Sequence, residues 1–165
     1  MTYAPDLDRI ATPIGIVTIR GDETAITSIT IEADHTIAET ASRAAAVREA
    51  AAQLRAYFAG RLREFDLPLV PAATVRGQAL RDGIAAIPYG DTLSYGALAR
   101  QLSSAPRAVG QACARNPYPI IIPCHRVLAA QGRLGTYSGG TGPSTKQWLL
   151  NHEQPANRKG TPWPA

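Results

Sequence analysis

A thiol and an imidazole stand next to each other at Cys124 and His125, directly after the apolar run 120–122 and Pro123. A segment this apolar is expected to be buried, and a buried cysteine beside a base is a place where a thiolate can be generated for nucleophilic attack. A buried free cysteine is more commonly a small apolar side chain, so these two residues alone leave both interpretations open. The nucleophile hypothesis therefore depends on the motifs around them.

Several spaced motifs resemble those of the O6-alkylguanine-DNA alkyltransferase family, whose members are also called methylated-DNA-protein-cysteine methyltransferases. The resemblance is close over residues 84–153 and loose in the N-terminal half, where only 57–60 and 65–69 match. It is specific because the motifs occur in the order that the family shows. In chain order they are Ile87-Pro88-Tyr89-Gly90, Ser94-Tyr95-Gly96, Arg107-Ala108-Val109-Gly110, Asn116-Pro117, Pro123-Cys124-His125-Arg126-Val127, Tyr137-Ser138-Gly139-Gly140 and residues 146–153.

The resemblance implies that Cys124 attacks the alkyl carbon of O6-alkylguanine. Such an attack needs an ionised sulfur, and a thiol with a pKa of about 8.5 is only a few per cent ionised at neutral pH, so a base must help. Neighbouring side chains on an extended segment point to opposite sides, which makes a direct bond between Cys124 and His125 awkward. By resemblance, His125 deprotonates Cys124 through a bridging water, and Glu153 holds the imidazole in the useful tautomer.

A guanine inside a duplex cannot reach a buried sulfur, so the resemblance also implies that the nucleotide is flipped out of the helix. It assigns Tyr95 to crowding or hydrogen-bonding the flipped nucleotide and its phosphate. Arg107, on the recognition helix, would fill the vacated space in the stack, and Ala108 would allow close approach to the minor groove. Ser94 and Arg126 are the other expected DNA contacts.

The resemblance further implies a pocket for the flipped base. The backbone carbonyls of Cys124 and Val127 would accept from the exocyclic amine, and the backbone N–H of Ser138 would donate to O6. Asn116 matches a hinge residue that ties the recognition helix to the active-site segment. The expected lining residues are Val127, Tyr137, Ser138, Pro119 and Gly139.

The charge of the chain is uneven. Residues 1–75 hold seven Lys/Arg against ten Asp/Glu, a net of −3, and residues 76–165 hold ten against three, a net of +7. Positive charge in the half that carries the motifs suits double-stranded DNA as the partner. The two cysteines and three histidines are scattered, so we expect no metal site, and the chemistry requires no cofactor. Without an apolar run of membrane-spanning length or a signal sequence, the chain is expected to be cytoplasmic. We also expect it to be a monomer.

The expected fold class is α/β (α+β) with two domains, residues 1–72 and 73–165. For the first, a scaffold that by resemblance is ribonuclease H-like, we predict a hairpin over 12–33, a helix over 38–59 started by a capping box at Thr36 and Glu39, and a strand over 63–69. For the second, a winged-helix-like domain, we predict helices over 76–86, from Ser94 through Leu102 and from Pro106 through Arg115. The last two form a helix-turn-helix with a turn shorter than the family's usual one.

Two other functions remain open. Alkyltransferase-like proteins sense the lesion without transferring the group, but they replace the cysteine that is present here as Cys124. A hydrolase using Cys124, His125 and Glu153 would turn over repeatedly and ignore DNA.

Overall fold

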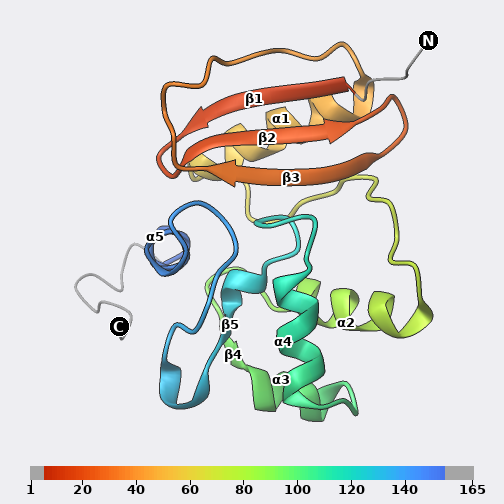
Figure 1. Cartoon of the computed structure of the whole chain (residues 1–165), viewed down its shortest axis with the longest axis vertical. Coiled ribbons are helices and arrows are strands. Elements are labelled where there is room, and N and C mark those ends of the chain that lie inside the picture. Colours follow the sequence, from red (N-terminus) through yellow and green to blue (C-terminus); the bar gives the residue numbers. More distant parts are fainter. Residues whose placement is uncertain (1–5, 155–165) are drawn as a thin grey trace. The chain divides into compact units, whose positions relative to one another are not determined.

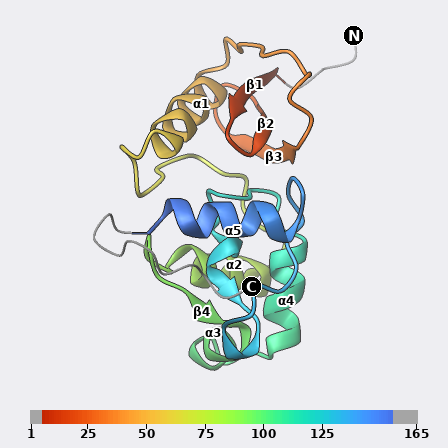
Figure 2. The same cartoon turned by 90° about the vertical axis from the view of Figure 1, so that its left-hand side faces the viewer.

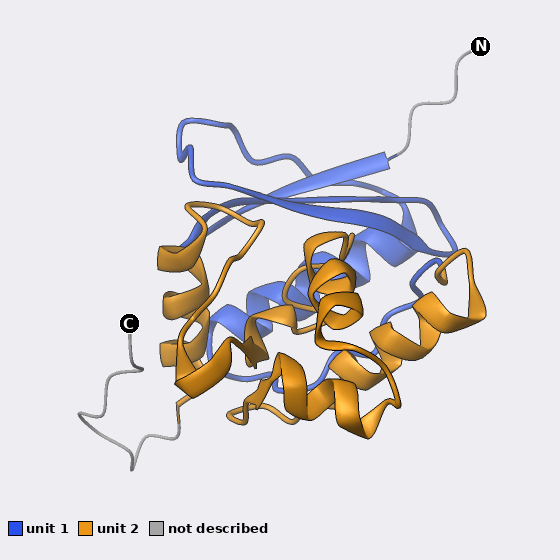
Figure 3. Ribbon diagram, turned by 60° about the horizontal axis from the view of Figure 1, so that its bottom comes forward, with its two compact units in different colours: residues 1–70 blue, residues 71–165 orange. Residues whose placement is uncertain are grey.

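The structure is a computed structural model that describes residues 6–154. The chain divides into two compact units, residues 1–70 and 71–165, which Figure 3 shows in different colours. Within the described residues, no helix is long and apolar enough to cross a membrane. The predicted combination of a small antiparallel sheet and a set of helices is confirmed.

The first unit is a three-stranded antiparallel sheet with one helix against it (Figure 1). The strands are β1 (Asp6–Thr12), β2 (Gly15–Gly21) and β3 (Ile26–Glu32), in the order β1-β2-β3. The helix α1 (Ala45–Phe58) lies along one face of the sheet (Figure 2) and buries Val47, Ala51 and Leu54 at helical spacing. The predicted hairpin is β2 and β3.

The third strand is not where the sequence pattern put it. It is β1, which pairs with β2 from Asp6↔Gly21 to Thr12↔Gly15. The segment 63–69 forms only one parallel bridge, Ile26↔Leu69, with hydrogen bonds from Ile26 N to Pro68 O (2.8 Å) and from Val70 N to Ile26 O (3.1 Å). Pro68 and Pro71 have no N–H to donate, which limits a ladder at this position.

The helix α1 also begins later than predicted, at Ala45 instead of residue 38. The proposed capping residues are occupied elsewhere: Thr36 bonds Asp34 Oδ1 through its N–H and its hydroxyl, and Glu39 accepts from Ala11 N at 2.7 Å. The first turn of α1 is instead capped from outside the helix, because Ala45 N donates to Glu23 Oε2 at 2.9 Å.

The second unit contains the three predicted helices, α2 (Val75–Ala85), α3 (Tyr95–Gln101) and α4 (Pro106–Ala114), each within about one residue of its predicted ends. Ser94 caps α3 by accepting from Ala97 N at 3.0 Å, and Pro106 occupies the first turn of α4. These local signals explain why the helix boundaries could be predicted.

The short turn between α3 and α4 has a defined geometry. Ser103 has φ 51°, a left-handed conformation, and Ser104 N donates to Ala99 O at 2.8 Å, which closes the end of α3 in a Schellman-type arrangement. Leu102 packs so closely on Gly83 of α2 that a Cβ there would lie 2.5 Å from its Cδ1. The helix-turn-helix thus packs on α2 through Leu102, whose side chain would have to shift if Gly83 were replaced by a larger residue.

Two further elements bring the motifs together. The short strands β4 (Leu93–Ser94) and β5 (Val127–Leu128) pair in parallel. The first residue of α3, Tyr95, therefore lies beside the segment that follows Cys124. A 3-10 turn, η1 (Cys124–Arg126), precedes β5, and a second, η2 (Ala130–Gly132), follows it. The last helix, α5 (Pro143–His152), lies beside η1 and ends at Glu153.

Candidate active site

The turn that carries Cys124 is held by Asn116, two residues after the end of α4. The side-chain amide of Asn116 donates to Ile122 O (2.8 Å) and to Cys124 Sγ (3.3 Å), and its Oδ1 accepts from Tyr118 N (2.9 Å). Ile120, in the middle of the turn, has φ 77°, which is strained for a β-branched residue. Asn116 therefore links the end of α4, the strained turn and the sulfur.

Cys124 and His125 do not lie on an extended segment, as the sequence analysis assumed, but on the 3-10 turn η1. No hydrogen bond joins the two side chains in this part of the structure. Instead, His125 Nε2 lies 2.8 Å from Glu153 Oε2, in a pair that is almost fully buried. His125 Nδ1, also buried, has no hydrogen-bond partner among the described residues. With the imidazole proton on Nε2, where it is donated to Glu153, the lone pair on Nδ1 is able to accept a proton.

The carboxylate of Glu153 is shared with Arg126. Arg126 Nε donates to Oε1 at 2.8 Å and its Nη2 to Oε2 at 3.0 Å, while its Nη1 donates to Ile87 O at 2.7 Å. Arg126 is only 5% exposed. Its guanidinium is thus buried on Glu153 instead of being presented to solvent, which argues against the expected contact with DNA.

The charge states in this network follow from burial and pairing. Burial alone would raise the pKa of Glu153, but the hydrogen bonds from His125 and Arg126 and the charge of Arg126 outweigh it and hold that pKa well below its ordinary range. Burial lowers the pKa of His125, and Glu153 offsets only part of this effect. The site at neutral pH is thus an ionised Glu153 paired with Arg126, and a neutral His125 that donates through Nε2.

Cys124 is a thiol in the resting site. Burial raises its pKa, while the hydrogen bond from Asn116 and the charge of Lys146 act in the opposite direction. A group that can take its proton is therefore needed before the sulfur can attack.

The sulfur of Cys124 opens onto a cavity of about 210 Å³. Burial raises the pKa of Tyr95 to about 12, and the two nearby cysteines add to the rise, so its hydroxyl stays protonated. The Tyr137 hydroxyl is buried and has no hydrogen-bond partner within the described part of the chain, which leaves it available to a polar atom of a ligand. The cavity is lined by Tyr95, Cys113, Ala114, Cys124, Thr136, Tyr137 and Ser138.

The other expected pocket residues have different positions. Pro119, Val127 and Gly139 are buried but are not among the residues that line this cavity. The Val127 carbonyl accepts from Lys146 Nζ at 2.7 Å, and the Cys124 carbonyl accepts from Val127 N. Each carbonyl oxygen has a second lone pair that remains for a base.

Lys146, on α5, is a site residue that the sequence analysis missed. Its side chain is fully buried, and Nζ donates to the carbonyls of Val127, Leu134 and Thr136, the last at 3.4 Å. None of the carboxylates in residues 6–154 forms an ion pair with it. Lys146 thereby ties β5 to the loop that carries the cavity residue Thr136.

A signal for Lys146 was present in the sequence. Lys146, Leu149, Leu150 and Glu153 follow the i, i+3, i+4, i+7 spacing of one helix face, and all four are buried. Because Lys146 and Glu153 lie on the same helix face as the apolar pair Leu149 and Leu150, the spacing indicates that both charged side chains point inward.

The residues expected to contact DNA lie at the start of α3 and α4. Arg107 is exposed at the second position of α4, and Ala108 beside it is half-buried. Ser94 and Tyr95 are also half-buried, at the β4–α3 junction. Tyr95 thus reaches the cavity from the same helix-turn-helix unit that presents Arg107.

A groove of about 360 Å³ between α2 and α4 extends this surface. Ala108 lines it together with three arginines, Arg76, Arg81 and Arg115, which were not among the predicted DNA contacts. Arg76 and Arg115 are exposed, and Arg76 Nη2 donates to Ser104 Oγ at 3.3 Å. Three arginines beside α4 give this groove a positive charge, which suits anionic groups.

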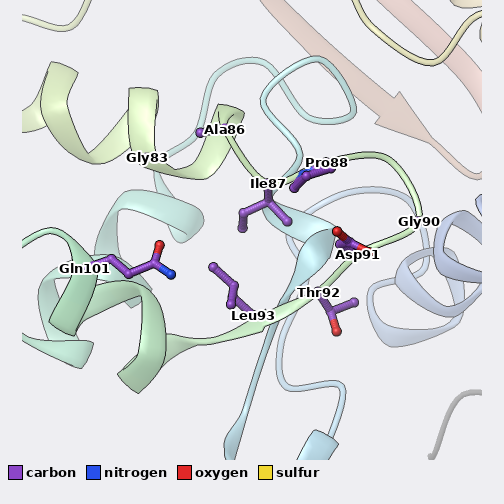
Figure 4. Close-up of a pocket in the computed structure, with 9 residues that line it drawn as sticks. All are labelled: Gly83, Ala86, Ile87, Pro88, Gly90, Asp91, Thr92, Leu93 and Gln101. Atoms are coloured by element: carbon purple, nitrogen blue, oxygen red, sulfur yellow. The ribbon is translucent and has the colours of Figure 1, made fainter.

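A larger cavity, of about 520 Å³, lies elsewhere (Figure 4). It is formed by the end of α2, the loop before β4, and Gln101 of α3. Its lining includes neither a cysteine nor a histidine, and Asp91 is its one charged residue. The smaller cavity at Cys124 is therefore the candidate for chemistry. Within residues 6–154, no group of three or more His, Cys, Asp or Glu side chains could hold a metal ion.

Comparison with known proteins gives matches over both units. The family description "6-O-methylguanine DNA methyltransferase, DNA binding domain" matches residues 77–155, and the ribonuclease-like domain of the same description matches residues 8–71. A methylated-DNA–protein-cysteine methyltransferase of Mycolicibacterium paratuberculosis is 40% identical over 152 residues, which cover 88% of this chain and 90% of the relative. One of Methanosarcina acetivorans is 45% identical over 108 residues, covering 64% of this chain and 68% of the relative.

Solved structures agree with these matches. Mycobacterium tuberculosis O6-methylguanine methyltransferase has 39% identity and a TM-score of 0.76, covering 93% of this chain and 96% of its own. The OGT of Mycobacterium tuberculosis in complex with DNA has 40% identity and a TM-score of 0.76, covering 90% and 94%.

Proposed function

The chain belongs to the O6-methylguanine DNA methyltransferase family, and from this premise we propose that it repairs O6-alkylguanine in DNA by direct reversal, moving the alkyl group onto Cys124. The observation that carries the proposal is the cavity at Cys124, which adjoins a buried network of His125, Glu153 and Arg126. The chemistry needs no cofactor, because the thiol itself is the acceptor.

The first step is deprotonation of Cys124. A water molecule bridges Sγ and His125 Nδ1, the ring nitrogen that has no partner in the described structure, and passes the thiol proton to the imidazole. Glu153 accepts from Nε2 and stabilises the imidazolium, while Arg126 fixes the carboxylate. The charge of Lys146 and the amide of Asn116 favour the thiolate that forms.

The second step is an in-line attack on the alkyl carbon. A sulfur–carbon bond forms, the carbon–O6 bond breaks, and its electron pair leaves with the guanine. The N–H of Ser138 stabilises the developing charge on O6, and the carbonyls of Cys124 and Val127 orient the exocyclic amine. The product on Cys124 is a thioether, so each molecule reacts once.

The lesion reaches the cavity by base flipping. The helix α4 enters the minor groove, Arg107 occupies the space that the guanine leaves, and Ala108 permits close approach. Tyr95, at the edge of the cavity, contacts the flipped nucleotide, and Ser94 lies next to it. The arginines of the α2–α4 groove receive backbone phosphates of double-stranded DNA.

The protein acts as a monomer in the cytoplasm. One unit of one chain supplies the nucleophile, the base and the cavity, so no second copy is required for the chemistry. Cys113 and Cys124 are both free thiols, the state that a reducing compartment maintains.

The test is to incubate the protein with a duplex that contains one O6-methylguanine and to follow both by intact mass. We expect the protein to gain one methyl group and the DNA to lose it, with the reaction stopping at one equivalent. Cys124→Ser should still bind the duplex and gain nothing, because a hydroxyl does not ionise usefully here.

The other two functions give different results in the same experiment. Binding of the duplex without any mass gain would mean lesion sensing, and repeated release of product would mean hydrolysis. A relative that aligns with most of this chain is named as a cysteine methyltransferase, which favours transfer over sensing.

A further inference from the structure

The cavity at Cys124 contains a second thiol that the proposed repair reaction does not use. Cys113, in the last turn of α4, lines the same cavity of about 210 Å³. Both cysteines are buried, at 8% and 4% exposure, and both are free thiols. Two free cysteines therefore line one small cavity.

Asn116 fixes the two cysteines relative to each other. Its backbone N–H donates to the Cys113 carbonyl at 3.3 Å, and its side-chain amide donates to Cys124 Sγ at 3.3 Å. The end of α4 and the turn η1 are thus connected through one residue. The pair of thiols is a feature of the folded unit and does not depend on a mobile segment.

The electrostatic surroundings suit an anion that spans both sulfurs. Burial raises the pKa of Cys113 to about 12, and Cys124, which lines the same cavity, adds to the rise. The positive charge of Lys146 acts in the opposite direction and reduces this rise in the pKa of both thiols. Its ammonium is fully buried without a carboxylate partner in residues 6–154, so a negative charge in the cavity would compensate it.

The donor set selects the kind of ion. Zinc needs four ligands, and calcium and magnesium need oxygen ligands, but this part of the chain has no group of three or more His, Cys, Asp or Glu that could supply them. Two thiolates without a third ligand suit a soft cation that accepts two-coordination, of which Cu(I) is the common biological example.

We propose that Cys113 and Cys124 together bind one Cu(I) ion, which bridges the two sulfurs and blocks Cys124. Binding releases one proton from each thiol to the solvent and gives a bis-thiolate complex with a single negative charge beside Lys146. No electron is transferred. The inference goes beyond alkyl transfer and does not depend on it, since it requires only the two thiols in one cavity.

The test is an anaerobic titration of the full chain with Cu(I) in competition with a chromogenic chelator. We expect one Cu(I) per chain, two protons released, and loss of alkyl transfer that a strong Cu(I) chelator restores. Loss of a partner that only supports a metal ligand costs roughly 10- to 100-fold in metal affinity. Cys113→Ser removes a direct ligand, so we expect its affinity for Cu(I) to fall by more than that. The circular dichroism spectrum and the denaturant unfolding midpoint of the same variant should match those of the wild type, which shows that it is folded.

A second measurement needs no substitution. X-ray absorption of the wild-type complex should show two thiolate sulfurs on copper at one Cu(I) per monomeric chain, and the chain has two cysteines in total. One sulfur on copper, or equal affinity in the wild type and Cys113→Ser, would overturn the proposal. If alkyl transfer is absent from both proteins before copper is added, the proposed function fails while the Cu(I) titration still decides this inference.

Discussion

The two units of the chain differ in what they bury. Within the described residues, the first unit buries one Asp, Glu, Lys, Arg or His side chain, Asp8, and burial raises its pKa. The described part of the second unit buries four side chains of these types, namely His125, Arg126, Lys146 and Glu153. Buried charges are expensive unless they are paired and hydrogen-bonded. The second unit therefore buries charged side chains at a cost in stability, which we attribute to its chemistry, whereas the core of the first unit is that of a scaffold.

The comparison predicts unequal effects when the same change is made in each unit. Glu153→Gln removes a charge that serves both His125 and Arg126, so we expect alkyl transfer to slow by about 10²- to 10⁴-fold and the free energy of unfolding to fall by about 3 kcal/mol or more. Single-turnover kinetics and denaturant unfolding measure the two effects.

Glu49→Gln on α1 is the matched control. Glu49 is exposed and accepts only from Gln53 Nε2, so the change should stay within about 0.5 kcal/mol and leave the rate unchanged. Equal losses at Glu49 and Glu153 would break the comparison.

The pH dependence of the rate tests whether the buried network supplies the base. Because burial lowers the pKa of His125, its neutral form persists to a pH below the ordinary histidine value of 6.5. If the Cys124 proton passes to His125 inside the site, the rate should be independent of pH between the lowered pKa of His125 and the pH range where the thiol itself ionises. Below the pKa of His125, where the imidazole is protonated, the rate should fall by about tenfold for each pH unit. A steady rise of about tenfold per pH unit through neutrality would instead mean that solvent deprotonates the thiol.

The role of the helix-turn-helix is tested by a change that should matter only for duplex DNA. Arg107→Ala should cost about 1 to 3 kcal/mol on duplex repair and little on reaction with free O6-methylguanine, which needs no flipping. Arg48→Ala, at an exposed position of α1, is the control and should change neither. Equal losses on both substrates would assign Arg107 to the fold.

The smallest expected effect concerns the α2–α4 groove. Arg76→Ala and Arg115→Ala should each weaken DNA binding for all sequences and reduce the slope of log K against log salt by about 0.9 per lost phosphate contact. An unchanged slope in both variants would remove the groove from the DNA interface and leave α4 as the contact.

Sequence reasoning succeeded where the signals are local. The ends of α3 and α4 follow from Ser94 and Pro106, whose capping roles require only their own helices. It failed where the partner is distant. The strand β1 has few apolar residues and is recognised only by its pairing with β2, and α1 is capped by Glu23, which lies 22 residues before the helix begins.

The same limit applies to the site. Arg126 stands in a basic half of the chain and beside the motif, which favoured DNA as its partner, but its carboxylate lies 27 residues away at Glu153. Lys146 bonds three backbone carbonyls, and such acceptors leave no mark on the sequence. Cys113 is placed in the cavity by the end of α4, not by any motif around it.

The central claim is that the buried network of the second unit activates one particular sulfur. The most direct measurement is to react the wild-type protein with duplex DNA carrying isotopically labelled O6-methylguanine, digest it, and locate the label by tandem mass spectrometry. We predict label on Cys124 alone, at one methyl group per chain. Label on Cys113, or a repaired duplex with no label on either cysteine, would contradict it.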